Sequence, residues 1–302
     1  MPADAFSAPG RFFRGNLHTH SNRSDGKISP EEVCARYRER GYDFICLSDH
    51  FMPKYEYPIT DTTAYRTDGF CTILGAECHA PATAAGEQWH ILAVGLPLDF
   101  PPNLDGETGP QIARRCLDAG AFLAIPHPEW YGLTTEDAAS IPGAHAVEIY
   151  NHTSQVRQSR GGGAYYLDML LAGGRRINAL ACDDAHWLVE GDENRDAFGG
   201  WVMVKAERNE PAALVAALKA GHYYATQGPV IETIAVKDGH IEIACSAAAQ
   251  IIVVGRASRN EAVAGFDLTR ARFPLGKFSG SWCRAMVVAQ DGKTAWSNPI
   301  YL

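Results

Sequence analysis

The sequence has no long apolar run, no Cys-x-x-Cys pair and no excess of basic residues. A membrane-spanning helix needs about 20 apolar residues, so none is expected. The first six residues also lack a basic region followed by an apolar one, as a secretory signal would have. The eight cysteines are scattered, mostly inside apolar runs, as buried reduced thiols are. We therefore expect a cytoplasmic protein without a membrane partner.

Basic residues are also fewer than acidic ones. The chain has 35 acidic and 27 basic residues, a formal charge of −8, so no broad positive surface would attract nucleic acid or an anionic membrane. No nucleic-acid polymer is expected as a partner, and the lack of a basic stripe or polymerase-like region disfavours a polymerase-associated proofreading role. No solenoid repeat or low-complexity tract is present. Composition does not indicate the oligomeric state.

What is present is a globular composition, with 46% hydrophobic and 21% charged residues in 302. A chain of this length can bury a large core, which suits one barrel or a barrel with a small appendage.

A strand–helix–strand pattern opens the chain. Ser29 as N-cap, Pro30 at the first helical position and Glu32 in a capping box predict a helix, which Gly41 would end. The next residues, 42–47, are nearly all apolar, as in a strand buried on both faces of a parallel sheet.

The same alternation continues. Further strand-like runs are residues 72–76, 91–94, 121–125, 146–150, 177–181 and 201–204. Helical stretches between them are residues 111–119, 164–172 and 211–220. The pattern predicts an α/β fold, a (β/α) barrel of about seven strands. Polar residues at the carboxyl ends of barrel strands form the active site in such folds.

The pattern changes after Pro229. From residue 230 on, short alternating runs are separated by glycine and Asp-Gly turns, without a helical period. We expect a barrel over residues 12–229 and a small all-β domain over residues 230–302. The small domain holds no cluster of candidate ligands, so packing against the barrel or supporting an oligomer is expected of it rather than chemistry.

Six of the eleven histidines fall at predicted strand boundaries. His18 and His20, one residue apart, would leave a strand on the same side, and nitrogen and oxygen donors suit zinc, manganese or iron. The candidate ligands are His18, His20, Asp25, His50, Glu77, His90, His127, Asp184 and His186. Nine donors exceed the four or so that one ion takes. We therefore expect two to three divalent ions with Glu77 as a bridging carboxylate.

The motifs around these residues resemble the PHP family, named after DNA polymerases and histidinol phosphatase. They are His18-Thr19-His20 with Ser24-Asp25-Gly26, Ser48-Asp49-His50, Gly75-Ala76-Glu77, Pro126-His127-Pro128 and Asp184-Ala185-His186. The resemblance covers about residues 12–227 and implies a distorted (β/α)7 barrel with a trinuclear site.

The resemblance also implies which residues share an ion. One ion would be held by His18, His20, Glu77 and Asp184, a second by Asp25, His50 and His186, and a third by Glu77, His90 and His127. Residues 223–229 and 296–299 are similar to a subgroup in which a small β domain follows the barrel. That subgroup includes carbamate-ester hydrolases and presumed phosphoesterases.

We therefore expect a metal-dependent phosphoesterase acting on a small phosphomonoester or nucleotide through a hydroxide that bridges two ions. Asp184 and His186 are the candidates for proton transfer to the leaving group. The alternative on the same metals is hydrolysis of a carboxylic or carbamate ester. A non-catalytic module is disfavoured, because buried imidazoles and carboxylates without metal would be costly to bring together.

Arg157 and Arg160 precede residues 161–163 and a helix start, where guanidinium and backbone N–H groups could cradle an anion. Merely solvated arginines are the alternative. Glu148 and Asn151 end a predicted strand and would either contact substrate or serve the structure.

Four further residues adjoin the predicted site. His79 and His152 match no ligand motif, so we expect them behind the ligands or in loops. Asp49 and Asp183 would either orient imidazoles or make hydrogen bonds at strand ends.

Overall fold

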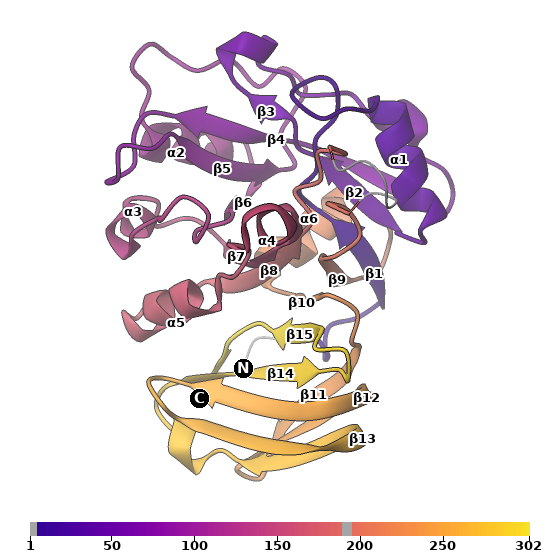
Figure 1. The fold of residues 1–302 in the computed structure, drawn as a ribbon, viewed down its shortest axis with the longest axis vertical. Helices are drawn as coiled ribbons and strands as arrows, with labels where there is room; N and C mark the ends of the chain where they lie inside the picture. Colours follow the sequence, from indigo (N-terminus) through magenta and orange to yellow (C-terminus); the bar gives the residue numbers. More distant parts are fainter. Residues whose placement is uncertain (1–4, 189–194) are drawn as a thin grey trace.

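The protein is a mixed α/β fold with one large sheet, seen in a computed structural model that describes residues 5–188 and 195–302 (Figure 1). The strands up to residue 226 are β1 (Arg11–Asn16), β2 (Phe44–Leu47), β3 (His50–Phe51), β4 (Cys71–Ala80), β5 (Trp89–Val94), β6 (Phe122–Ile125), β7 (Ala146–Asn151), β8 (Asn178–Cys182), β9 (Trp201–Ala206) and β10 (Tyr223–Thr226).

Helices connect several of these strands. They are α1 (Pro30–Glu39), α2 (Gly109–Asp118), α3 (Thr135–Ser140), α4 (His152–Gln158), α5 (Ala164–Ala172) and α6 (Pro211–Ala220), with 3-10 turns η1 (Pro53–Tyr55), η2 (Thr63–Tyr65) and η3 (Gly276–Phe278). The Ser29 side chain accepts the Glu32 N–H at the start of α1, so this predicted helix and its cap are confirmed. The predicted helices at α2, α5 and α6 are confirmed too, whereas α3 and α4 were not predicted. None of the described helices is both long and apolar enough to cross a bilayer.

The sheet is mixed rather than parallel throughout. Strands β1, β2 and β4 pair in parallel, as do β6, β7 and β8. Strand β5 runs antiparallel to both β4 and β6, because only residues 81–88 join β4 to β5 and no crossover helix fits in so short a link. Strand β9 is antiparallel to β1 and β10. The sheet curls, since β8 contacts β9 and β10.

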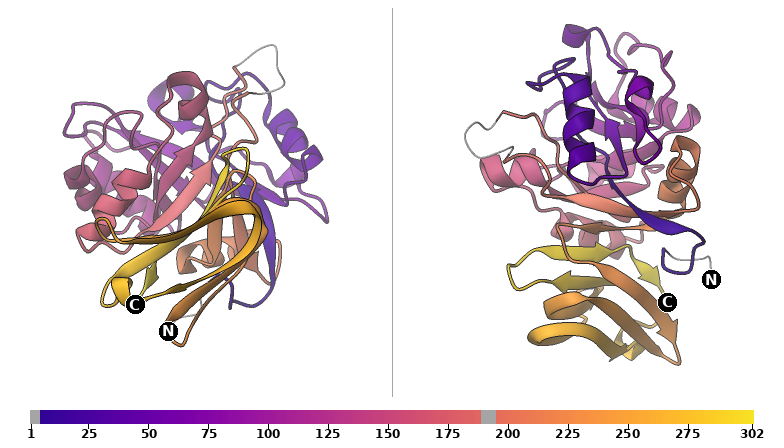
Figure 2. Two further views of the ribbon diagram at one scale, coloured as in Figure 1. Left: turned by 60° about the horizontal axis from the view of Figure 1, so that its bottom comes forward. Right: turned by 90° about the vertical axis from the view of Figure 1, so that its right-hand side faces the viewer.

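From residue 231 on, the elements of regular structure are strands and η3. They are β11 (Ile231–Lys237), β12 (His240–Gly255), β13 (Asn260–Pro274), β14 (Trp282–Val288), β15 (Thr294–Ser297) and β16 (Ile300–Tyr301). All their pairings are antiparallel. They lie together below the rest in Figure 1, and the right-hand view of Figure 2 shows the same separation from another side. Strand β15 pairs with β10, so the sheet continues from one region to the other.

A buried apolar cluster lies beneath the polar strand ends. Its members from the strands, or just beyond their ends, include Leu17, Phe44, Leu92, Phe122, Leu180, Val202 and Tyr223. His18 directly follows Leu17, and His127 comes shortly after β6. The polar residues at the carboxyl ends of β1, β2, β6 and β8 therefore lie next to this buried apolar cluster.

Candidate metal centre

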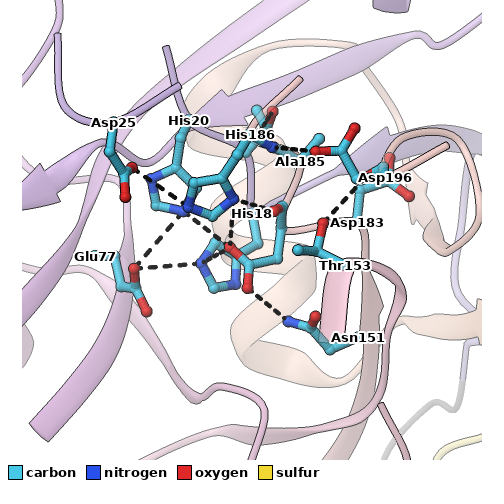
Figure 3. A network of polar contacts seen from close by, with 12 residues as sticks. His18, His20, Asp25, Glu77, Asn151, Thr153, Asp183, Ala185, His186 and Asp196 are labelled. Carbon is cyan, nitrogen blue, oxygen red and sulfur yellow. Dashed lines mark hydrogen bonds and ion pairs between the residues drawn. The ribbon is translucent and has the colours of Figure 1, made fainter. Parts of the chain in front are cut away.

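All nine predicted ligands converge in space. His18 and His20 follow β1, Asp25 lies in the next loop, His50 begins β3, Glu77 is in β4, His90 is in β5, His127 follows β6, and Asp184 and His186 follow β8. They form overlapping groups in which one donor atom of each member lies within 4.8 Å of the others. Figure 3 shows His18, His20 and His186 gathered together, with Asp25 and Glu77 beside them.

Glu77 lies at the middle of the cluster and is fully buried. Its Oε1 lies 2.7 Å from His90 Nδ1 and 3.1 Å from His127 Nε2. Its Oε2 lies 2.7 Å from His50 Nδ1 and 3.6 Å from His18 Nε2. The two oxygens of one carboxylate therefore face different histidines.

Asp25 and Asp184 supply the other carboxylates. Asp25 Oδ1 is 3.3 Å from both His50 Nε2 and His186 Nε2, and these residues form a four-membered group with His20. Asp184 Oδ1 lies 2.9 Å from His20 Nε2. The backbone of Asp184 has a positive φ of 57°, a conformation that side chains rarely adopt, which turns it back toward the histidines.

Burial and charge set the protonation of these groups. Burial alone would lower the pKa of His50, but the carboxylates of Glu77 and Asp25 raise it to about 10. Burial together with His186 and His50 lowers the pKa of His20 to about 3. Burial would raise the pKa of Glu77, yet the surrounding histidines hold it well below its usual value. Ionised Glu77 and neutral His20 are the forms that bind metal, whereas His50 must first lose a proton.

Several buried side-chain atoms that could bind a metal ion have no hydrogen-bond partner within the described residues. These include Glu77 Oε2, His18 Nε2 and the Nδ1 atoms of His20 and His127. Unpaired polar atoms this deep are costly unless something else binds them. A set of imidazole nitrogens and carboxylate oxygens without thiolate fits zinc, manganese or iron. The residues therefore fit metal ions.

Glu148 and Asn151 lie behind the ligands rather than on the cavity wall. Glu148 Oε1 is 2.8 Å from His18 Nδ1, and its Oε2 accepts the backbone N–H of His127 at 2.7 Å. The Asn151 amide donates to Glu148 Oε2 and, at 3.1 Å, to Asp184 Oδ2. Both side chains are fully buried. Of the two roles left open for these residues, the contacts favour the structural one, in which they orient the candidate ligands.

A cavity of about 250 Å³ opens onto the cluster. Its walls combine seven candidate ligands with Trp130, Thr153, Ser154, Arg157 and Gln158. The last four belong to α4, which begins where Asn151 caps the Ser154 N–H. Sequence reasoning treated the segment as a loop and missed three of these residues, although an asparagine followed by His-Thr-Ser is a usable N-cap signal.

The predicted anion cradle is only partly present. Arg157 lines the cavity, but Arg160 does not, and its guanidinium lies 3.5 Å from the Trp130 carbonyl oxygen. The backbone N–H of Gly162 donates to Glu129, and that of Gly163 donates to the Ile149 carbonyl. Because these N–H groups are already bonded, Arg157 is the part of the cradle that can reach a ligand.

The remaining neighbours behave differently from one another. Asp49 accepts hydrogen bonds from Ser21 and Ser24, so it orders the loop after β1 rather than an imidazole. Asp183 accepts from the Tyr37 hydroxyl and from the backbone N–H groups of residues 198–200. His152 contacts the Tyr150 hydroxyl, away from the cluster.

Comparison with known proteins agrees with this geometry. Residues 16–99 match the family model of the PHP domain. The chain therefore contains a region similar to the PHP domain. The match confirms the resemblance seen in the motifs and spans six of the nine candidate ligands, from His18 to His90.

Solved structures similar to this chain share little sequence with it. A two-domain protein from Bacteroides vulgatus, described as containing a predicted PHP-like metal-dependent phosphoesterase, is 15% identical, with a TM-score of 0.54 over 100% of this chain and 99% of its own. A putative metal-dependent phosphoesterase from Bifidobacterium adolescentis is 15% identical (TM-score 0.44, 60% and 91% covered). An amidohydrolase from Chromobacterium violaceum with bound sulfate and no metal is 12% identical (TM-score 0.40, 57% and 87% covered). No curated protein matches the chain.

Proposed function

We propose that this protein is a metal-dependent hydrolase, with ions bound by the nine candidate ligands that converge at one edge of the sheet. One observation supports this above the others. The two oxygens of the buried Glu77 face different histidines, His90 and His127 on one side and His50 and His18 on the other. A carboxylate in this position can bridge ions and offset their mutual repulsion.

The proposed ligand sets follow the family pattern. They are His18, His20, Glu77 and Asp184 for one ion, Asp25, His50 and His186 for a second, and Glu77, His90 and His127 for a third. Zinc, manganese and iron all suit these donors. When bound, the ions supply Lewis acidity and make water a stronger acid near neutral pH.

Hydrogen bonds within the chain orient the side chains that would transfer protons. His186 Nδ1–H donates to the Asp184 carbonyl oxygen at 2.7 Å, so its Nε2 lone pair faces Asp25. The Asp184 carboxylate is held by the Asn151 amide and lies on the cavity wall. We assign the proton transfer to the leaving group to Asp184 ahead of His186, since both line the cavity but both ring nitrogens of His186 would be engaged.

A phosphoester is the proposed substrate class. Arg157 brings a guanidinium to the wall of a small cavity in an acidic protein, and it can pair with phosphate oxygens. A volume of about 250 Å³ suits a small phosphomonoester or one part of a nucleotide. The description of the Bacteroides vulgatus protein, similar over the whole chain, points the same way.

The same proposal includes the architecture. Residues 12–229 would form a distorted (β/α)7 barrel of PHP type, and residues 230–302 a small all-β domain. The curling of the sheet, which brings β8 against β9, supports the barrel. The change to antiparallel strands after residue 230 supports the separate domain.

The test compares matched substrates. Protein reconstituted with manganese or zinc should hydrolyse p-nitrophenyl phosphate with a higher kcat/KM than p-nitrophenyl acetate or a p-nitrophenyl carbamate, and inorganic phosphate should inhibit competitively. If the acetate or carbamate is cleaved faster and phosphate does not inhibit, the ester-hydrolase alternative replaces the phosphoesterase proposal. If metal-loaded protein cleaves none of them, the hydrolase proposal itself fails on these substrate classes.

A further inference from the structure

His79 lies inside the candidate metal centre, although it matches none of the ligand motifs. It is two residues after Glu77 on β4, so the alternation of a strand puts both side chains on the same face. It is paired in register with His90 on β5, and the two rings lie 4.3 Å apart, edge to face. Only 3% of His79 is exposed.

The ring of His79 makes one close polar contact, and it is with His50. His79 Nε2 lies 2.8 Å from His50 Nδ1 in hydrogen-bonding geometry. Glu77 Oε2 is equally near, at 2.7 Å from His50 Nδ1, but it has no hydrogen-bond partner within the described residues. Two acceptors therefore face His50 Nδ1, and His79 is the one of them that is not a candidate metal ligand.

This hydrogen bond bears on which nitrogen of His50 can bind an ion. A neutral imidazole ligates through one nitrogen and carries its proton on the other. His50 Nε2 faces Asp25 Oδ1 at 3.3 Å, in the group that also contains His186. If Nε2 binds the ion, the proton sits on Nδ1 and needs an acceptor, and Glu77 is engaged by the other ions.

We propose that His79 is the positioning residue for the ion shared by Asp25, His50 and His186. Its Nε2 accepts the His50 Nδ1–H and so fixes the tautomer and ring orientation of His50. The backbone of His79 is itself held, because the Asn103 amide donates to its carbonyl oxygen at 2.6 Å. The inference rests on the proposed metal-dependent function and adds a tenth residue to its site.

Direct ligation by His79 is the competing reading, since His50, Glu77 and His79 also form a group within 4.8 Å. Two substitutions separate the readings. His79→Gln keeps an acceptor oxygen near the position of Nε2 but supplies a poor zinc ligand. His79→Leu removes both functions while keeping the bulk. His152→Leu is the matched control, because His152 also matches no ligand motif but contacts the Tyr150 hydroxyl instead of a candidate ligand.

The readout is the number of zinc ions per chain and the affinity of the weakest one, from elemental analysis and chelator competition. His79→Leu should lower the affinity for one ion about 10–100-fold, as for residues that orient metal-binding histidines, and leave the other ions bound. His79→Gln and His152→Leu should bind zinc like the wild type. Equal loss in His79→Gln and His79→Leu would make His79 a ligand and overturn the proposal, as would unchanged zinc binding in His79→Leu.

A second measurement needs no variant. In zinc-loaded protein labelled with 15N-histidine, long-range 15N–1H correlations should show the proton of His50 on Nδ1. A proton on Nε2 contradicts the proposal even if His79→Leu does not fold. Failure of the proposed function looks different, because the wild type itself would then bind at most one ion.

Discussion

The two regions of the sheet bury very different side chains. Up to residue 226, the described residues include many buried polar and charged groups, among them His18, Glu77 and Glu148. From residue 231 on, those described as buried and polar are Arg284, Thr294 and Ser297. The two regions differ in this respect although their strands pair in one continuous sheet.

The contrast shows where the chain accepts an energetic cost. A buried imidazole or carboxylate is stabilising only when it is paired or bound, and otherwise it destabilises the fold. Such groups are concentrated at the carboxyl ends of the strands of the first region. We infer that chemistry resides there, while the region from residue 231 on contributes shape and packing.

The largest effect is expected from Glu77→Gln, which changes one atom at the centre of the first region. Because Glu77 is assigned to two ions, this substitution should remove more metal and more activity than His90→Ala, which affects one. A neutral amide also cannot offset the repulsion between cations. Elemental analysis and kcat/KM of both variants provide the check, and equal metal losses would contradict the bridging role.

The second region should affect stability without affecting metal. Arg284 in β14 is 3% exposed and forms two 2.9 Å hydrogen bonds to Asp168 in α5. Asp168→Ala leaves that guanidinium unpaired, so the free energy of unfolding in urea should fall by roughly 1.5 kcal/mol, the low end for a charged hydrogen bond, since Asp168 is partly exposed.

The matched control for Asp168→Ala is Asp118→Ala, which breaks an exposed pair with Arg114 on α2. It should change stability by less than about 1 kcal/mol. Metal content should stay the same in both variants. Loss of ions in Asp168→Ala would show that the two regions are coupled, and the contrast drawn here would fail.

Within the first region, two neighbouring arginines sharpen the comparison between wall and surface. Arg157→Ala should weaken the binding of a phosphate substrate by about 1.5 kcal/mol or less, because Arg157 lines the cavity but is exposed. Arg160→Ala, outside the cavity, should change kcat/KM little. Cleavage of an aryl acetate should be unaffected by either. A larger effect of Arg160→Ala than of Arg157→Ala would contradict the placement of the substrate in this cavity.

The smallest effect is a proton count. The carboxylates around His50 outweigh its burial and raise its pKa to about 10, so at pH 8 the ion-free residue is protonated. Metal binding must displace that proton, and metal affinity should therefore rise between pH 7 and pH 9. Calorimetry of zinc binding in two buffers of different ionisation enthalpy should show at least one proton released, since the pKa values of His18 and His186 are raised as well. Equal enthalpies in the two buffers would contradict this.

Most of the candidate ligands could be located from sequence because they lie at or near an end of an apolar strand-like run, and strand ends meet at one edge of a sheet. Glu148 could not be placed correctly, because a strand-end carboxylate looks the same whether it faces the cavity or lies under His18. His79 could be expected behind the ligands, but the sequence does not show that His50 is the imidazole it contacts. The antiparallel β5 was not predicted either, because an apolar run carries no direction.

The central claim is a multinuclear site, and the ion count of the wild-type protein tests it most directly. Protein purified without chelator and reconstituted with zinc or manganese, then analysed by elemental analysis and anomalous diffraction, should approach three ions per chain. Two of the three ions should lie next to Glu77, one at each of its carboxylate oxygens. At most one ion per chain after reconstitution would contradict the account.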